Sequence, residues 1–333
     1  MRMRRHNEQD SQFAKHIRAL ISEKRGLGLK FYAEGERLWD FNRFILEQGF
    51  KDTVVTKEIS EKWSIVRPNE SEANRILRFG TVQRFSKFLV RMGYSSYVSC
   101  AKVSWRTKDF KAYIFTDDES NRFLQATHKI TFYAGSKVRY LVVPMLFTIL
   151  FCTGIRIGEA LSLKRESIIF DGECAFLDVY SEKHNKTRRL PLAPDLSVRL
   201  RKYLDEMEAR AQNSNLLFPA PHGGQYTQAP IYRAFREILW EAGISYGGRG
   251  KGPRIHDIRH TFAVKSLRKL VLSKVNPQEA FPFLSTYLGH KNLSATQTYI
   301  QLTAELFPYI VQNMEEYCGQ IVPLMEVPHD KAD

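Results

Sequence analysis

The sequence contains few cysteines and no pattern that would join them. The four residues, Cys100, Cys152, Cys174 and Cys318, lie far apart, and none belongs to a Cys-x-x-Cys pair. This spacing argues against both a zinc site and a disulfide framework, so we expect reduced thiols.

Long hydrophobic runs are also missing. The most apolar stretch, Leu141 to Cys152, contains Pro144 and is too short to cross a bilayer, which favours a buried core helix. The charged start, Met1 to Asp10, is not followed by the apolar segment of a secretory signal. Internal repeats and low-complexity tracts are not found either. We therefore expect a cytoplasmic protein without a transmembrane segment.

Acidic residues are outnumbered, with 36 Asp and Glu against 50 Lys and Arg, which gives a net charge of +14. A charge of this sign attracts polyanions, and the release of their counterions adds to binding. Nucleic acid and an anionic membrane surface both fit this observation. The length of 333 residues exceeds what one hydrophobic core usually supports, so two domains are expected.

The first hundred residues have the apolar spacing of helices. Leu38, Phe41 and Ile45 are spaced for one helical face. A second apolar face is predicted further along, formed by Phe79, Val82, Phe85, Leu89 and Met92. The pattern predicts a small helical bundle.

Basic residues follow the longer of these helices. Arg84, Lys87 and Arg91 stand at i, i+3 and i+7, so they share a stripe opposite much of the apolar face. Such a stripe can lie along a phosphate backbone. A solvated helix face is the alternative interpretation.

We place a domain boundary after residue 108, which gives domains of residues 1–108 and 109–333. Thr116 and Glu119 form the T-x-x-E capping box of a new helix just beyond it. The segment Lys102 to Ile114 is basic and lacks periodicity, which suits either a strap along DNA or a simple connector.

One β-rich interruption divides the helical pattern of the second domain. Strands are predicted over Ser167 to Phe170, Cys174 to Tyr180 and Thr187 to Leu192, with Asp171-Gly172 as a hairpin turn. The second loop, Ser181 to Lys186, carries Lys183 at its tip. The expected fold class is therefore mainly α with a small antiparallel β-sheet (α+β).

A first polar cluster follows the apolar helix. Gly154 permits a tight turn, and Arg156 then opens a short helix with a guanidinium able to hold two phosphate oxygens. Glu159, three residues later, lies on the same face and is placed to orient Arg156. By itself this pair also fits a surface ion pair.

A second cluster combines a histidine and an arginine on one helical face. His256 and Arg259 stand one turn apart, while Ile258 and Phe262 point to the core. An imidazole can exchange a proton with a phosphate ester, and a guanidinium can neutralise charge as phosphorus becomes five-coordinate.

The same segment also imitates the H-E-x-x-H zinc helix, with Asp257 between His256 and His260. We disfavour this interpretation because the shorter aspartate reaches bound water less well and Arg259 would repel a metal. His290 is the only third ligand that we can suggest.

A third cluster begins where Gly289 ends a helix and is followed by His290. Ser294 is the expected N-cap of the next helix, and Tyr299 lies about one turn into it. A phenol is a poor nucleophile at neutral pH, so it needs cationic or hydrogen-bonding neighbours as it loses its proton. Three other tyrosines are nearby rivals: Tyr287, Tyr309 and Tyr317.

Taken together, the motifs T-G-I-R-I-G-E-A-L, a lysine on a β-turn, H-D-I-R-H-T-F-A, L-G-H and a tyrosine nine residues later resemble the tyrosine recombinase family, also called phage integrases. The resemblance spans roughly Thr116 to Tyr309. The helical region before it looks like the core-binding domain of this family, which leaves an integrase-type catalytic domain as the second unit.

The resemblance implies a site-specific recombinase or integrase of a bacterial or mobile-element type. Its partner would be double-stranded DNA rather than a membrane, with a dimer on each site and a tetramer in the synapse. A tyrosine attacks the scissile phosphate, which forms a 3'-phosphotyrosine bond and releases a 5'-hydroxyl. No metal, ATP or other cofactor is implied.

The family pattern assigns roles to individual residues. Tyr299 is the nucleophile, while Arg156 and Arg259 hold the non-bridging oxygens and Glu159 supports them. His256 assists proton transfer, and His290 stabilises the transition state.

Lys183 is the implied general acid, although Glu182 and His184 stand where many family members have glycine. Lys186 is the alternative general acid, or it contacts DNA from the loop.

The last predicted helix has an apolar stripe. Its residues are Leu306, Ile310, Met314 and Tyr317. In relatives such a helix docks on the neighbouring protomer, so we expect self-association through it on DNA. Packing within its own domain is the alternative.

Two other functions fit parts of the pattern. One is a catalytically inactive relative that only binds DNA, and the other is strand relaxation like that of a type IB topoisomerase. Because all six catalytic positions hold competent residue types and the spacing fits a recombinase better, we favour the recombinase.

Overall fold

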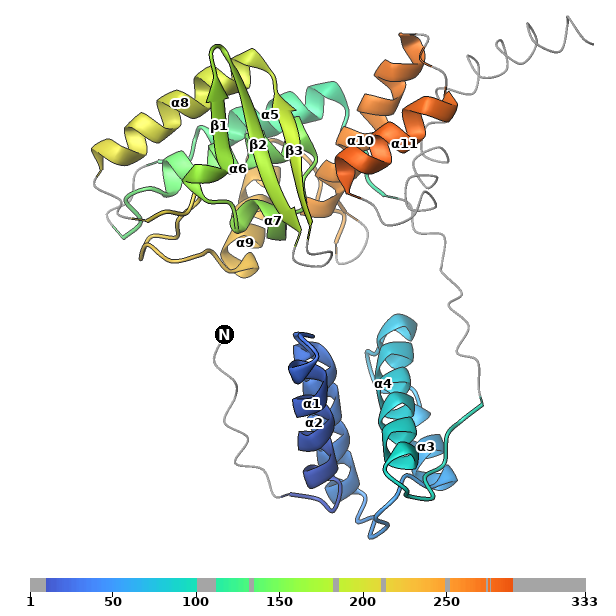
Figure 1. Cartoon of the computed structure of the whole chain (residues 1–333). Helices are drawn as coiled ribbons and strands as arrows, with labels where there is room; N and C mark the ends of the chain where they lie inside the picture. The colour runs from blue at the N-terminus through green and yellow to red at the C-terminus, as the bar shows by residue number, and fades with distance from the viewer. Residues whose placement is uncertain are drawn as a thin grey trace, which may run out of the picture. The chain divides into compact units, whose positions relative to one another are not determined.

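The structure is a computed structural model of the whole chain. It describes residues 10–100, 112–131, 135–181, 186–210, 214–248, 252–273, 275 and 277–289. Its contacts separate two compact units, Met1–Asp109 and Phe110–Asp333 (Figure 1). The connecting residues 101–111, which contain most of the predicted strap, lie outside the described residues.

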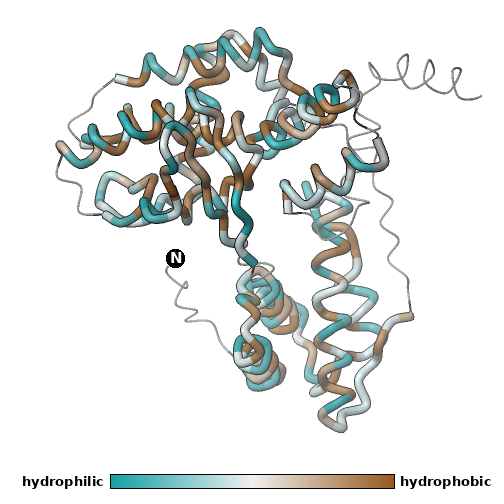
Figure 2. The backbone as a smooth tube through the Cα atoms, turned by 45° about the horizontal axis from the view of Figure 1, so that its top comes forward, coloured by the Kyte–Doolittle hydropathy of each residue, from teal (hydrophilic) through white to brown (hydrophobic). Residues whose placement is uncertain are grey.

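The part of the N-terminal unit that the structure describes is built from helices. They are α1 (Ala14–Gly26), α2 (Tyr32–Glu47), α3 (Lys57–Ser64) and α4 (Glu72–Arg91). Hydrophilic and hydrophobic residues alternate along these helices (Figure 2), as expected for helices that bury one face. The side chains of Thr56 and Ser71 cap α3 and α4 by accepting bonds from Ile59 N and Asn74 N.

Aromatic residues hold the core of this unit together. The ring of Phe41 in α2 lies 5.7 Å from Phe13, 5.1 Å from Trp63 and 6.2 Å from Phe85 between centroids. Each partner comes from a different helix or its cap, so one cluster joins all four helices. The predicted helical bundle is thus confirmed.

The two predicted apolar faces are buried in the structure except at one residue. Leu38, Phe41 and Ile45 are completely buried, and the second face is buried as far as Leu89. The prediction for Met92 is wrong, because α4 ends at Arg91 and Met92 is its 56% exposed C-cap.

The second unit contains the sheet and seven further described α-helices. Before the sheet come α5 (Asp117–Thr127), α6 (Arg139–Thr153), α7 (Ile157–Leu161) and the short 3₁₀ helix η1 (Arg165–Ser167). After it come α8 (Pro194–Ala209), α9 (Gln228–Glu241), α10 (Ile255–Leu272) and α11 (Pro277–Leu288). The predicted capping box at the start of α5 is present, since Thr116 and Glu119 satisfy each other's backbone N–H groups.

The sheet is antiparallel, with β2 (Cys174–Ser181) between β1 (Ile168–Asp171) and β3 (Lys186–Leu192) (Figure 1). Asp171 pairs with Cys174, and Ser181 pairs with Lys186. Helices α7 and α8 contact β2, and α8 also contacts α6. This arrangement confirms the expected α+β class with a small antiparallel sheet.

Helix α6 is the apolar helix that the sequence predicted. Val142, Leu146, Phe147 and Leu150 are at most 2% exposed, and Pro144 lies inside the helix. Within the part of the chain that the structure describes, none of the helices combines the length and apolar character that a bilayer crossing requires.

Candidate active site

The site begins at the turn between α6 and α7. Gly154 ends α6 with a φ of +62°, in the left-handed region that favours glycine. A Cβ atom at this position would lie 2.4 Å from Cδ1 of Phe262 in α10, closer than two carbon atoms can approach. The backbone conformation and the close approach of α10 therefore both require glycine here.

Arg156 follows this turn as the N-cap of α7. Its backbone N–H donates to Oε2 of Glu159 at 3.1 Å, and its Nη1 donates to Oε1 at 2.9 Å. The carboxylate thus holds both the backbone and the side chain of Arg156. About a third of the Arg156 side chain, 31%, remains exposed, so its guanidinium is accessible to a ligand.

Glu159 has a second basic partner, Arg188 of β3. Nη2 of Arg188 donates to Oε2 at 2.7 Å, and Nη1 donates to Oε1 at 3.3 Å. Burial by itself would raise the pKa of Glu159, but the bonds from Arg188 and Arg156 outweigh it and hold the pKa below its usual range. The carboxylate is therefore ionised between two guanidinium groups.

The role of Arg188 was missed in the sequence. The alternation of β3 is the signal that could have found it, because Arg188 stands on the same face as the buried Leu190 and Leu192. An arginine on the buried face of a strand needs an acidic or carbonyl partner.

Helix α10 contributes the second cluster. Asp257 is buried in its first turn and accepts a bond from Arg254 N at 2.8 Å. Arg259 is only 2% exposed, and its two Nη atoms donate to Gly154 O at 2.9 Å and to Leu288 O at 2.7 Å. These bonds let a guanidinium stand in the interior, and they join α10 to the turn that precedes Arg156.

His256 lies on the exposed side of α10. Neighbouring atoms displace part of its hydration, which lowers its pKa, and the charges of Arg259, Arg156 and Arg254 act in the same direction. His256 is therefore predominantly neutral at neutral pH and able to accept a proton. Its ring meets that of His260 edge to face at 4.9 Å, and the pKa of His260 is lowered to about 4, mainly by burial.

The C-terminus of α11 is where these segments meet. Arg188 donates to Tyr287 O at 3.0 Å, Arg259 to Leu288 O at 2.7 Å, and Arg156 to Gly289 O at 3.3 Å. Three consecutive carbonyl groups are thus bound by arginines from β3, α10 and the start of α7. Gly289 has a φ of +69°, and a Cβ there would lie 3.2 Å from the guanidinium carbon of Arg188.

The structure therefore brings Arg156, Glu159, His256 and Arg259 into one region. Lys183, His290 and Tyr299 lie outside the described residues, as do the rival tyrosines Tyr309 and Tyr317 and the predicted last helix. Lys186 is described as the exposed first residue of β3, where it pairs with Ser181.

The remaining rival nucleophile, Tyr287, is half-buried in the core. Its ring stacks on that of Phe262 at 5.5 Å between centroids, and burial raises its pKa to about 12. A phenol in this environment is harder to ionise than an ordinary tyrosine, which makes Tyr287 a poor candidate.

The zinc interpretation gains no support from the described residues. His256 and His260 are neighbours, but no group of three or more His, Cys, Asp or Glu side chains suited to a metal ion occurs among residues that the structure describes. His290, the suggested third ligand, is not among them.

The basic stripe of the N-terminal unit is exposed along α4. Arg91 forms an ion pair with Glu23 of α1, and Arg84 donates to Thr81 Oγ1 at 3.4 Å. Lys87 stands between them and is also exposed. The positive charge of Arg91 is therefore partly compensated within the protein.

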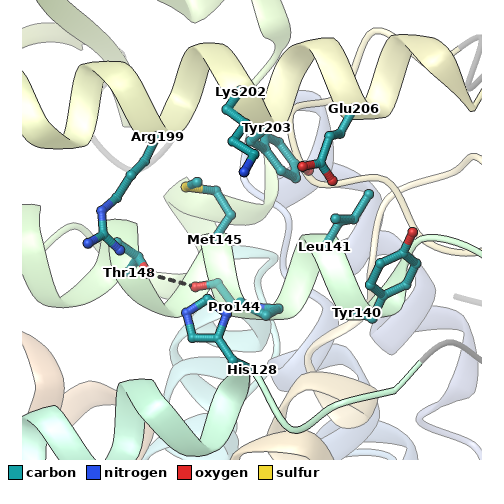
Figure 3. A pocket seen from close by; sticks show the side chains of 10 residues that line it. All are labelled: His128, Tyr140, Leu141, Pro144, Met145, Thr148, Arg199, Lys202, Tyr203 and Glu206. Atoms are coloured by element: carbon teal, nitrogen blue, oxygen red, sulfur yellow. Dashed lines mark hydrogen bonds between the residues drawn. The ribbon is translucent and has the colours of Figure 1, made fainter.

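A separate pocket of about 270 Å³ lies between α6 and α8 (Figure 3). It is lined on one side by Tyr140 and Met145 and on the other by Arg199 and Tyr203. None of the predicted site residues lines it, so this pocket is distinct from the arginine cluster, which consists of Arg156, Arg188 and Arg259 at the end of α11.

The sequence of this chain was compared with models of protein families and with known proteins. The model of the phage integrase family matches residues 114–305. A protein of Sinorhizobium fredii described as the integrase/recombinase y4rB is 28% identical over 311 residues, which cover 92% of this chain and 98% of that protein.

Solved structures share the fold. The XerH site-specific recombinase bound to palindromic difH substrate matches with a TM-score of 0.64 and 21% identity, covering 91% of this chain and 83% of that one. A lambda integrase tetramer bound to a Holliday junction matches with a TM-score of 0.59 and 17% identity, covering 88% and 78%.

Proposed function

Because the chain belongs to the phage integrase family, we propose that it acts as a site-specific tyrosine recombinase through the residues of the arginine cluster. Enzymes of this family break and rejoin DNA strands through a 3'-phosphotyrosine intermediate, and this chain is an enzyme of that kind. The observation that supports the site assignment is the convergence of Arg156 and Arg259 on adjacent carbonyl groups at the end of α11.

In the proposed cleavage step, Oη of Tyr299 forms a bond to the scissile phosphorus as the bond to the 5'-oxygen breaks. The phenolic proton passes to neutral His256, and Lys183 gives a proton to the leaving 5'-oxygen. Arg156 and Arg259 stabilise the charge on the non-bridging oxygens, supported by His290. Attack by a 5'-hydroxyl of the partner strand reverses these transfers and rejoins the DNA.

The electrostatics of the described residues fit this scheme. The lowered pKa of His256 leaves its imidazole free to accept a proton at neutral pH. The exposed part of Arg156 offers donors to a phosphate, and Glu159 fixes its orientation.

The proposed partner is double-stranded DNA, and we assign the core-binding role to residues 1–108. By analogy with the lambda integrase dimer bound to a COC' core site and the lambda integrase tetramer bound to a Holliday junction, we propose that two protomers bind each site and four form the synapse. The predicted helix over 305–317 is the proposed contact between protomers. Its deletion should abolish assembly on DNA but not binding by a single protomer.

Covalent trapping tests the proposal and selects the target sequence in the same experiment. Wild-type protein is incubated with nicked duplexes of randomised sequence, and complexes that survive SDS are isolated and sequenced. We expect wild type to become attached, with or without EDTA, and Tyr299→Phe to bind the selected duplex without attachment. Tyr287→Phe is the matched control and should still become attached.

Each other outcome favours a different function. Attachment by Tyr299→Phe would exclude Tyr299 as the nucleophile, and loss of attachment in EDTA would favour the metal interpretation. Binding without attachment by wild type would identify an inactive relative. Relaxation of a supercoiled plasmid without exchange between two duplexes would favour a topoisomerase.

A further inference from the structure

Arg188 links three segments of the second unit. It extends from β3, contacts both oxygens of Glu159 in α7, and donates from Nε to Tyr287 O of α11 at 3.0 Å. Only 14% of its side chain is exposed. Its planar guanidinium has five N–H donors in a fixed fork, so it binds the carboxylate with two nitrogens and the carbonyl with a third, whereas a lysine has a single nitrogen.

The charge of Arg188 also affects Arg156. Glu159 is 8% exposed and accepts bonds from both arginines. With Arg156 as its only partner, the carboxylate would neutralise the arginine assigned to the phosphate. Because Arg188 shares the carboxylate, the three groups together keep a net positive charge.

The neighbouring Arg189 provides a natural contrast. It stands on the opposite face of β3, its side chain is 56% exposed, and it forms an ion pair with Asp178 of β2 at 2.8 Å. The two arginines are adjacent in sequence and share a strand, yet only Arg188 contacts the segments that carry the site.

We propose that Arg188 is a positioning residue for strand cleavage, which holds Glu159 against Arg156 and fixes the end of α11 that leads to His290. This inference rests on the proposed function. Arg188 itself touches neither the nucleophile nor the phosphate in this scheme, and it acts through Glu159 and the carbonyl of Tyr287.

Single-turnover cleavage of the nicked duplex selected by wild type tests this role. Arg188→Ala should cleave more slowly by up to about 100-fold while binding the duplex normally, because small displacements of catalytic groups have effects of this size. Arg188→Lys should recover part of the rate, and Arg189→Ala should stay within about twofold of wild type.

The pH profile separates positioning from a general loss of structure. In Arg188→Ala the pKa of Glu159 should be higher than in wild type, because the bonds from Arg188 that oppose the effect of burial are lost. Cleavage by Arg188→Ala should therefore decline at a higher pH than cleavage by wild type. In the Glu159→Gln background this additional pH dependence should disappear. Equal rates and equal pH profiles for Arg188→Ala and Arg189→Ala would overturn the inference and leave the proposed function intact.

If wild type forms no adduct, that result rejects the proposed function. The contacts of Arg188 with the end of α11 are then tested by a measurement without DNA. The amide of Gly289 donates to Thr286 O at 3.0 Å, and its hydrogen exchange reports on the end of α11. Exchange should be faster in Arg188→Ala than in Arg189→Ala. Equal exchange would overturn the inference, and Arg188→Lys serves for both measurements if the alanine variant does not fold.

Discussion

Arg259 donates a hydrogen bond to the carbonyl oxygen of Leu288 at 2.7 Å, although 29 residues separate them in the sequence. Helix C-termini carry unsatisfied carbonyl groups and a partial negative charge, which favour cations. The end of α11 receives three arginines in this way. The protein thereby holds positive charge in place, which is the preorganisation that the proposed electrostatic role of these arginines requires.

Arg259→Lys should destabilise the second unit even though the charge is kept. A single ammonium group cannot bind Gly154 O and Leu288 O in the present geometry, so one buried carbonyl loses its partner, at a cost of roughly 1–3 kcal/mol. Thermal unfolding checks this, with Arg189→Lys as the exposed control. Equal melting temperatures for the two variants would contradict it.

Gly154→Ala should be more harmful than Gly158→Ala. A Cβ at Gly154 would collide with Phe262, and its φ of +62° is strained for alanine, so we expect a loss of roughly 1–3 kcal/mol or more. A Cβ at Gly158, in α7, meets nothing within 4 Å. Chemical denaturation of the two variants compares them directly, and equal stability would show that the turn tolerates a side chain.

The elements were largely predictable because their signals are local. The Asp171-Gly172 turn and the alternation around it place β1 to within one residue, and the Thr116 capping box marks the start of α5. The prediction that Met92 is buried was wrong because apolar spacing alone does not reveal where a helix ends.

The contacts of the site were not predictable in the same way. The motifs supplied Arg156 and Arg259, but no sequence spacing indicates that Arg156 binds Gly289 O across 133 residues or that Arg188 binds Tyr287 O across 99. Such pairs arise only when β3, α7 and α11 pack together, so Arg188 went unnoticed despite its place on the buried face of β3.

Glu159→Gln should lower the free energy of unfolding of the second unit and make that free energy less dependent on pH in the acidic range. The ion pairs hold the pKa of Glu159 below the unfolded value of about 4.3, so their stabilisation is present above that pH and is lost as pH falls through the folded pKa. At neutral pH we expect a loss of roughly 1–3 kcal/mol, measured by denaturation across a pH series.

Asp178→Asn is the matched control for this substitution, because it breaks the exposed pair with Arg189. It should change stability by less than about 1 kcal/mol. If both variants lost the same amount of stability, the burial of Glu159 between two arginines would have no special effect.

Lys87→Ala should reduce the salt dependence of DNA binding. If Lys87 contacts a phosphate, its removal lowers the slope of log affinity against log salt by about 1. Arg91→Ala should change the slope less, because Glu23 already compensates part of its charge. Arg75→Ala, which breaks a pair with Glu72 in the first turns of the same helix, is the control.

These slopes are measured by titrating a short duplex of random sequence at several salt concentrations. An unchanged slope for Lys87→Ala would identify the stripe as a solvated helix face.

The most direct test of the central claim is to identify the tyrosine that becomes linked to DNA. Adducts trapped on the selected nicked duplex are digested with nuclease and protease, and the peptide that retains a nucleotide is sequenced by mass spectrometry. The proposed function predicts the modification on Tyr299. A nucleotide on Tyr287, Tyr309 or Tyr317, or on no tyrosine at all, would contradict it.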